Sequence, residues 1–111
     1  MITARGVQQL QDLEKVFKAL AHATRRRVLV VVNARGGRMS AGQIAGRFSC
    51  AWPTVSRHLR VLEEAGLLRV DRQGREWVYV LDHARLQAVV GDWLGWFKPE
   101  AEEVEDEPGW S

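Results

Sequence analysis

Apolar residues recur at three- and four-residue steps in five stretches of the chain, and this spacing predicts five amphipathic helices. Flanking residues favour a helix for the second stretch, since its valine-rich run 28–32 alone is also compatible with a buried strand. The predicted helices cover residues 8–21, 23–33, 41–48, 52–65 and, after Asp82 as N-cap, the segment that ends before Pro99.

Alternating apolar and polar residues replace the helical spacing after Gly66, and this alternation predicts strands at residues 67–71 and 76–81. Gly74 between the strands can supply the positive φ of a short hairpin turn. Arg72 and Arg75 flank the tip of this hairpin.

The stretch 49–66 reads as a bounded helix, with Pro53 in its first turn and Gly66 after its end. Its apolar side carries Val55, Leu59 and Leu62. The opposite side carries Thr54, Ser56, Arg57 and Arg60. Hydroxyls and guanidiniums are the groups that reach base edges and phosphates when a helix lies in a major groove. Trp52, just before Pro53, either contacts DNA or rests on the preceding turn; the sequence supports both interpretations.

A short helix precedes this stretch, with Ser40 as N-cap and Gln43 three residues later, as in a capping box. Helix, turn and bounded second helix form a helix-turn-helix, and a basic-tipped hairpin directly after it is a wing. The predicted fold is therefore mainly α with a small β-hairpin, an α+β winged helix-turn-helix in the order α-α-α-α-β-β-α.

The 111 residues fit one domain, which we expect over residues 8–98, after a flexible N-terminus at 1–7. Up to Lys98 sixteen basic residues face eight acidic ones, whereas residues 99–111 carry six acids and no base. A basic domain with an acidic, disordered tail indicates a polyanionic partner.

Several classes of protein lack support in this sequence. No uncharged apolar stretch is long enough to span a membrane, and the N-terminal residues form no long apolar run behind a basic start, so a cytoplasmic protein is expected. The single cysteine, Cys50, excludes an intrachain disulfide. No nucleophile with a base, metal cluster or phosphate-binding glycine loop is present, so neither an enzyme nor a cofactor is predicted.

With these elements in place, the chain resembles the ArsR/SmtB family of dimeric bacterial winged-helix repressors. The resemblance rests on three segments, FKALAHATRRRVL (17–29), PTVSRHLRVLEEAGLL (53–68) and DRQGREWVYVL (71–81). It implies a homodimer whose two recognition helices enter successive major grooves of a palindromic double-stranded operator. Carried onto this sequence, the family's DNA-contacting positions are Thr54, Ser56, Arg57 and His58 in the helix and Arg72 and Arg75 in the wing.

The family's dimer contacts lie in the first and last helices. The last helix here carries more apolar and aromatic surface than a domain of this size needs for its own core, which independently predicts a subunit interface. The expected interface residues are Leu10, Leu13, Phe17, Val89, Val90, Trp93, Leu94, Trp96 and Phe97.

The sequence also departs from the family. The metal sites known in the family need cysteines before the recognition helix or an Asp-x-His motif with later ligands, and neither pattern occurs, so no metal site is predicted. Ala51 stands where the family places a serine cap, a change that costs about 1 kcal/mol of helix stability.

Two alternatives stay open. A winged helix of this kind could serve as a protein-interaction module that binds a partner through its aromatic last helix. Alternatively, the repressor could sense oxidants through Cys50 at the head of the recognition helix, although a small apolar packing role explains the same residue.

Overall fold

A computed structural model describes residues 3–97 and 99. The helices are α1 (Ala4–Leu20), α2 (Ala23–Ala34), α3 (Ala41–Ala45), α4 (Trp52–Glu64) and α5 (His83–Gly95). The strands are β1 (Arg38–Ser40), β2 (Leu68–Gln73) and β3 (Glu76–Leu81). The predicted α+β winged helix is confirmed, with one strand more than expected.

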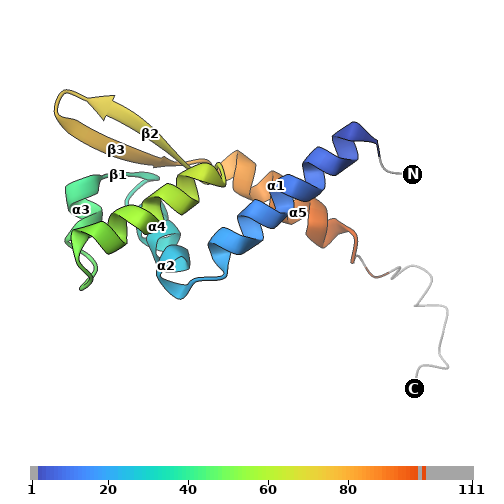
Figure 1. Cartoon of the computed structure of the whole chain (residues 1–111), viewed down its shortest axis with the longest axis horizontal. Coiled ribbons are helices and arrows are strands. Elements are labelled where there is room, and N and C mark those ends of the chain that lie inside the picture. Colours follow the sequence, from blue (N-terminus) through green and yellow to red (C-terminus); the bar gives the residue numbers. More distant parts are fainter. Residues whose placement is uncertain (1–2, 98, 100–111) are drawn as a thin grey trace, which may run out of the picture.

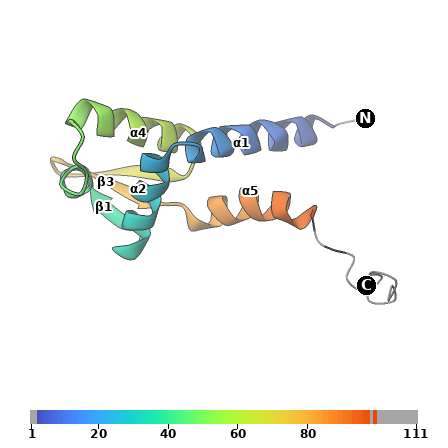
Figure 2. The same cartoon turned by 90° about the horizontal axis from the view of Figure 1, so that it is seen from below.

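Two parts of the fold are visible in Figures 1 and 2. Helices α2, α3 and α4 gather beside the sheet, and the hairpin of β2 and β3 extends from this body. Helices α1 and α5 lie side by side at the other end in both views. No helix within the described residues is long and apolar enough to span a membrane.

The sheet is antiparallel, in the order β1-β3-β2. The extra strand β1 lies between α2 and α3, where Met39 pairs with Tyr79. Three residues are too few to show an alternating pattern, so this strand could not be recognised from its own sequence. Met39 is nevertheless 2% exposed, so its burial and the free edge of β3 provide the stabilisation.

Two predicted helix boundaries are corrected. Helix α1 begins at Ala4, within the segment expected to be flexible, because the Thr3 hydroxyl caps it by accepting a hydrogen bond from the Gly6 N–H at 3.0 Å. Helix α3 ends at Ala45 instead of Phe48, with Gly46 as its C-cap. Its predicted capping box between Ser40 and Gln43 is confirmed.

One core joins the body to α1. Its fully buried side chains include Val16 of α1, Val32 of α2, Ile44 of α3 and Leu59 and Leu62 of α4. The apolar sides of four helices thus meet at one centre, and α4 contributes the most central positions. Its orientation is fixed from inside, which determines what its other side presents to solvent.

Candidate nucleic-acid interface

The exposed side of α4 is basic in its first turns and acidic in its last turn, where Glu63 and Glu64 are exposed. Val55, Leu59 and Leu62 are at most 1% exposed, so the residues opposite them point outward, and these include the exposed Arg57 and Arg60. Thr54 and Ser56 lie half-buried at the two margins of this side. The helix therefore presents two guanidiniums flanked by hydroxyls, as predicted.

The first turn of α4 also agrees with the sequence. Ala51 is the N-cap and accepts no hydrogen bond through its side chain, and Pro53 occupies the first turn, where its missing N–H leaves no donor unpaired. Trp52 is 46% exposed, so its ring is available to a partner. Whether it contacts DNA stays a prediction.

The structure corrects the placement of His58. The family resemblance put this residue among the outward polar groups, but its side chain is 8% exposed and lies on the core side of α4. The physical reason is helical spacing: His58 stands three residues after Val55 and four before Leu62, on the same side as both. His58 therefore packs on the buried side of α4.

His58 belongs to a small cluster with His22 and Arg25. The two imidazole rings lie 4.4 Å apart, and Arg25 Nη1 is 3.4 Å from His58 Nδ1. His22 Nδ1 accepts a hydrogen bond from the Thr24 N–H and so caps α2. Burial lowers the pKa of His58 below its ordinary 6.5, and the positive charges of His22, Arg25 and Arg57 lower it further. The cluster therefore favours a neutral His58.

Two arginines of the triplet 25–27 have structural partners. Arg25 donates to the carbonyl oxygens of Ala19 at 2.7 Å and Lys18 at 3.0 Å, and Arg26 donates to Leu20 at 2.7 Å. These carbonyls end α1, where the helix dipole favours positive charge. The first two arginines thus fix α2 to α1, and their guanidiniums are committed there.

The wing is the hairpin of β2 and β3. Gln73 pairs with Glu76, which leaves Gly74 and Arg75 as the two turn residues. Arg72 and Arg75 are exposed, and the Arg72 guanidinium lies 4.8 Å from the centroid of the Trp77 ring. The predicted basic tip is therefore present, with an aromatic residue beside it.

An open groove of about 560 Å³ lies between the first turns of α4, the start of α3 and the wing strand β3. Trp52 and Ser56 line it from α4, and Arg75, Trp77 and Tyr79 line it from the wing. The groove brings residues from the two predicted DNA-binding elements to one surface.

The other predicted surface, on α1 and α5, is apolar. Trp93 lies between two aromatic rings, 4.8 Å from Phe17 and 5.0 Å from Phe97 in edge-to-face geometry. The exposed fraction rises toward the end of the chain, from 37% at Trp93 to 84% at Trp96. Among the remaining expected interface residues, Leu13, Phe17, Val89 and Val90 are half-buried, and Leu10, Leu94 and Phe97 are more than half exposed.

Known proteins resemble the chain in both sequence and fold. A family described as a helix-turn-helix domain matches residues 20–71. The transcriptional repressor SdpR of Bacillus subtilis is 36% identical over 82 residues, which cover 74% of this chain and 88% of SdpR. The arsenic resistance transcriptional regulator ArsR1 of Pseudomonas putida is 36% identical over 94 residues, covering 78% of this chain and 72% of ArsR1.

The chain belongs to the ArsR family of transcriptional regulators. The crystal structure of another ArsR family transcriptional regulator covers 96% of this chain and 98% of its own, at 28% identity and a TM-score of 0.67. The solution structure of a homodimeric winged helix-turn-helix DNA-binding domain from Mycobacterium bovis superposes with a TM-score of 0.68 at 22% identity, covering 97% and 91%. This second likeness supports the fold.

This ArsR family chain shows no obvious place for a metal within residues 3–97 and 99, where no three His, Cys, Asp or Glu side chains gather. Cys50 is a free thiol, half-buried against the core. This position is compatible with a packing role, and sensing by Cys50 stays a prediction. The acidic tail falls outside the described residues apart from Pro99.

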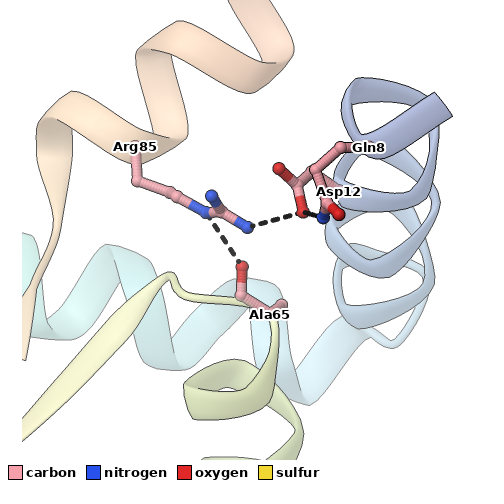
Figure 3. A network of polar contacts seen from close by, with 4 residues as sticks. All are labelled: Gln8, Asp12, Ala65 and Arg85. Atoms are coloured by element: carbon pink, nitrogen blue, oxygen red, sulfur yellow. Dashed lines mark hydrogen bonds and ion pairs between the residues drawn. The ribbon is translucent and has the colours of Figure 1, made fainter. Parts of the chain in front are cut away.

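Sequence patterns missed one residue that connects the two ends of this regulator. Arg85 of α5 donates through Nε to the carbonyl oxygen of Ala65, the C-cap of α4, at 3.2 Å (Figure 3). Its Nη2 lies 3.5 Å from the Asp12 carboxylate of α1, which also accepts a hydrogen bond from Gln8 at 3.0 Å. Arg85 therefore holds α1 and α5 against the end of the recognition helix.

The only sequence signal for this contact was the position of Arg85, four residues before Val89 on the apolar side of the last helix. Its partner Ala65 contributes a backbone carbonyl, which no pattern of side chains can reveal. Gly66 makes the contact possible, because its φ of +79° lets the chain turn and its missing side chain leaves room for the guanidinium.

Proposed function

We propose that this ArsR family regulator is a dimeric, sequence-specific transcriptional repressor. Its recognition helix, about residues 52–65, enters the major groove, and its wing, residues 71–76, lies on the backbone or in the minor groove. The observation that carries the proposal is the placement of basic α4 and the basic wing on either side of one groove. The repressor named among the relatives supports the same role.

The proposed dimer forms through α1 and α5. Support comes from the exposed aromatic end of α5, since contiguous apolar surface of this kind marks interaction sites. The homodimeric neighbour from Mycobacterium bovis has the same fold. A two-fold dimer places its recognition helices on half-sites about one helical turn apart, so we expect a palindromic operator.

The proposal places the protein in the cytoplasm and includes no catalytic step and no bound cofactor. Its relatives are named as regulators of transcription, which supports this view. Binding and release of DNA are then the whole of its activity.

Two arginine variants test the assignment. Duplexes selected from random DNA provide the operator, and fluorescence anisotropy measures affinity as a function of salt. We expect Arg57→Ala to cost about 1–3 kcal/mol on the operator and to relax base preference. Arg75→Ala should weaken binding to all sequences and lower the salt slope by about one.

Arg5→Ala is the matched control, because it removes the same charge from the exposed first turn of α1, far from α4 (Figure 1). Its binding curve should coincide with that of the parent. If Arg57→Ala and Arg75→Ala also bind the selected duplex like the parent, the assignment is wrong.

A second candidate is a protein-interaction module that uses the aromatic end of α5, and the 84% exposed Trp96 is the observation in its favour. Gel filtration with light scattering, with and without random DNA, separates the two. A DNA-induced increase in mass supports the repressor, whereas an unchanged mass in the presence of DNA supports the module.

For redox sensing through Cys50, unchanged operator affinity after diamide treatment would remove that option.

A further inference from the structure

The groove between α4 and the wing has two tryptophans in its lining. Trp52 comes from the first turn of the recognition helix and Trp77 from β3, and each is 46% exposed. Tyr79 forms part of the buried lining at 6% exposure, and Ser40 and Gly42 complete the α3 side. Large aromatic rings that stay half exposed on one small surface are suited to contact with a partner.

The Trp77 ring is held in place from the wing. It stands opposite Arg72 in the β2–β3 register, and the Arg72 guanidinium stacks against it at 4.8 Å. Burial, together with the Glu63 carboxylate, raises the pKa of the neighbouring Tyr79 hydroxyl above its ordinary 10, against an opposing effect of Arg60. Tyr79 is 6% exposed and belongs to the core cluster, so this part of the groove lining is fixed by the core.

The geometry of duplex DNA indicates which partner fits. A helix in the major groove and a wing at the adjoining minor groove lie on either side of one sugar-phosphate strand, because that strand forms the ridge between the two grooves. In this protein the space between these two elements is the tryptophan-lined groove. Arg75 in its lining and the exposed Arg57 and Arg60 nearby supply the complementary positive charge.

We propose that this groove receives the sugar-phosphate backbone of one operator strand, with Trp52 and Trp77 contacting it from opposite walls. Stacked bases in a duplex are inaccessible to these rings, so the apolar ring faces contact deoxyribose, and the indole N–H, which is only a donor, bonds to a phosphate oxygen. The inference rests on the proposed function and adds Trp77 to its DNA-binding residues.

Glu76 makes the inference sharper, because it is the only acidic residue in the groove lining. Glu76 directly precedes Trp77 on β3, so its side chain starts on the opposite face of the strand, but a carboxylate this near a phosphate strand is still repelled by it, and its neutral isostere should bind DNA better. Glu14 of α1 provides a control, since Glu14→Gln changes the net charge equally at an exposed position outside the groove lining.

The test measures the affinity of the full chain for its selected operator. We expect Trp77→Ala to weaken binding roughly tenfold and Trp77→Phe, which keeps a ring but no N–H, to weaken it by less. Glu76→Gln should tighten binding roughly threefold, well beyond the effect of Glu14→Gln. Circular dichroism and thermal unfolding check that each variant keeps its fold.

Phosphate ethylation interference then locates the contact. Ethylated phosphates that block the parent but no longer affect Trp77→Ala mark the strand segment in the groove. Replacing those phosphates by methylphosphonates should abolish the gain from Glu76→Gln, because no negative charge remains for Glu76 to repel.

The outcomes separate this inference from the proposed function. If Trp77→Ala and Glu76→Gln bind and show interference like the parent while Arg57→Ala loses base preference, the repressor assignment stands and the groove contact is wrong. A small molecule or protein as the natural occupant would give the same result. A parent that selects no duplex at all overturns both.

Discussion

The apolar side of α4 is buried within the domain, whereas much of the apolar side of α5 is exposed among the described residues. Around α4, the apolar residues Val55, Leu59 and Leu62 are at most 1% exposed. No residue of α5 is buried, and just after the helix the exposed fraction reaches 84% at Trp96 and 66% at Phe97. Both helices have strongly apolar sides, so the difference lies in what covers those sides.

This difference assigns a separate role to each end. The recognition helix obtains its position from contacts within its own chain, so the backbone that carries its exposed arginines is fixed by the core. Residues 3–97 and 99 leave the end of α5 exposed, and the proposed second copy would cover it. Arg85 lies between the two ends and helps to join them, together with the bonds of Arg25 and Arg26 to the end of α1 and the contact of His83 with Asn33.

The largest expected effect is a loss of stability in the core around α4. Leu59→Ala removes a fully buried side chain and should lower the free energy of unfolding by about 2–5 kcal/mol. Urea unfolding at fixed protein concentration measures the loss. Leu94→Ala, at 55% exposure, is the matched control and should cost much less in dilute protein. Equal losses would show that the two ends do not differ in this way.

The next effect concerns the incomplete core. Trp96→Glu places a charge in the proposed interface and should weaken self-association by at least about 30-fold, or about 2 kcal/mol. Sedimentation equilibrium measures the change. Val30→Glu is the control, because Val30 is also an exposed apolar residue, at 67%, but lies on α2. If both variants associate like the parent, the aromatic end of α5 is not the interface.

The connection between the ends predicts a smaller effect. An alanine at position 66 would have to adopt a positive φ, and its Cβ would lie 2.6 Å from Arg85 Nε. Gly66→Ala should therefore lower the free energy of unfolding by about 2 kcal/mol. Gly74→Ala isolates the backbone part, about 1 kcal/mol, because Gly74 has φ +63° and open space around it.

The double variant Gly66→Ala with Arg85→Ala sharpens this comparison. Unfolding free energies of the single and double variants give the coupling between the two positions. We expect the two costs to be less than additive, since removing the Arg85 side chain also removes the clash. Strictly additive costs would mean that Arg85 does not pack against this turn.

The smallest effect is a dependence on pH. The pKa of His58 is lowered in the folded protein, so the unfolded chain binds more protons once the pH falls below about 6.5. The stability that the folded state gains by keeping His58 neutral is fully present above about pH 6.5 and is lost as the pH falls further. His58→Gln keeps an acceptor for Arg25 but cannot titrate, so its unfolding free energy should fall less steeply from about pH 6.5 to 5. Parallel curves would contradict the prediction.

Local patterns revealed most of the fold because each long element repeats its own signal. The helical spacing in α4 extends over several turns between Pro53 and Gly66, which made its limits almost correct. Strand β1 has three residues, and its stability comes from pairing with β3, a segment about forty positions away. A short window of sequence cannot contain that contact.

The candidate site shows the same division. Arg57 and Arg60 are exposed as expected, because the apolar residues of α4 mark its buried side and leave these arginines on the opposite side. The wing arginines are exposed as expected because they flank the hairpin tip. His58 was placed wrongly, since the family resemblance put it among the outward residues while its spacing from Val55 and Leu62 puts it on the buried side. Trp77 was recognised only as a strand residue, and its place opposite Trp52 depends on how the wing packs beside α4.

The sequence by itself determined five helices, a hairpin, a basic α4 and an apolar α5, because these follow from periodicity and charge within short segments. The tertiary structure decided which distant groups meet: His22 with His58, Arg85 with the end of α4, and Trp52 with Trp77 across a groove. The physical reason is that contacts between elements depend on the packing of the whole core, which brings together residues that no local pattern relates.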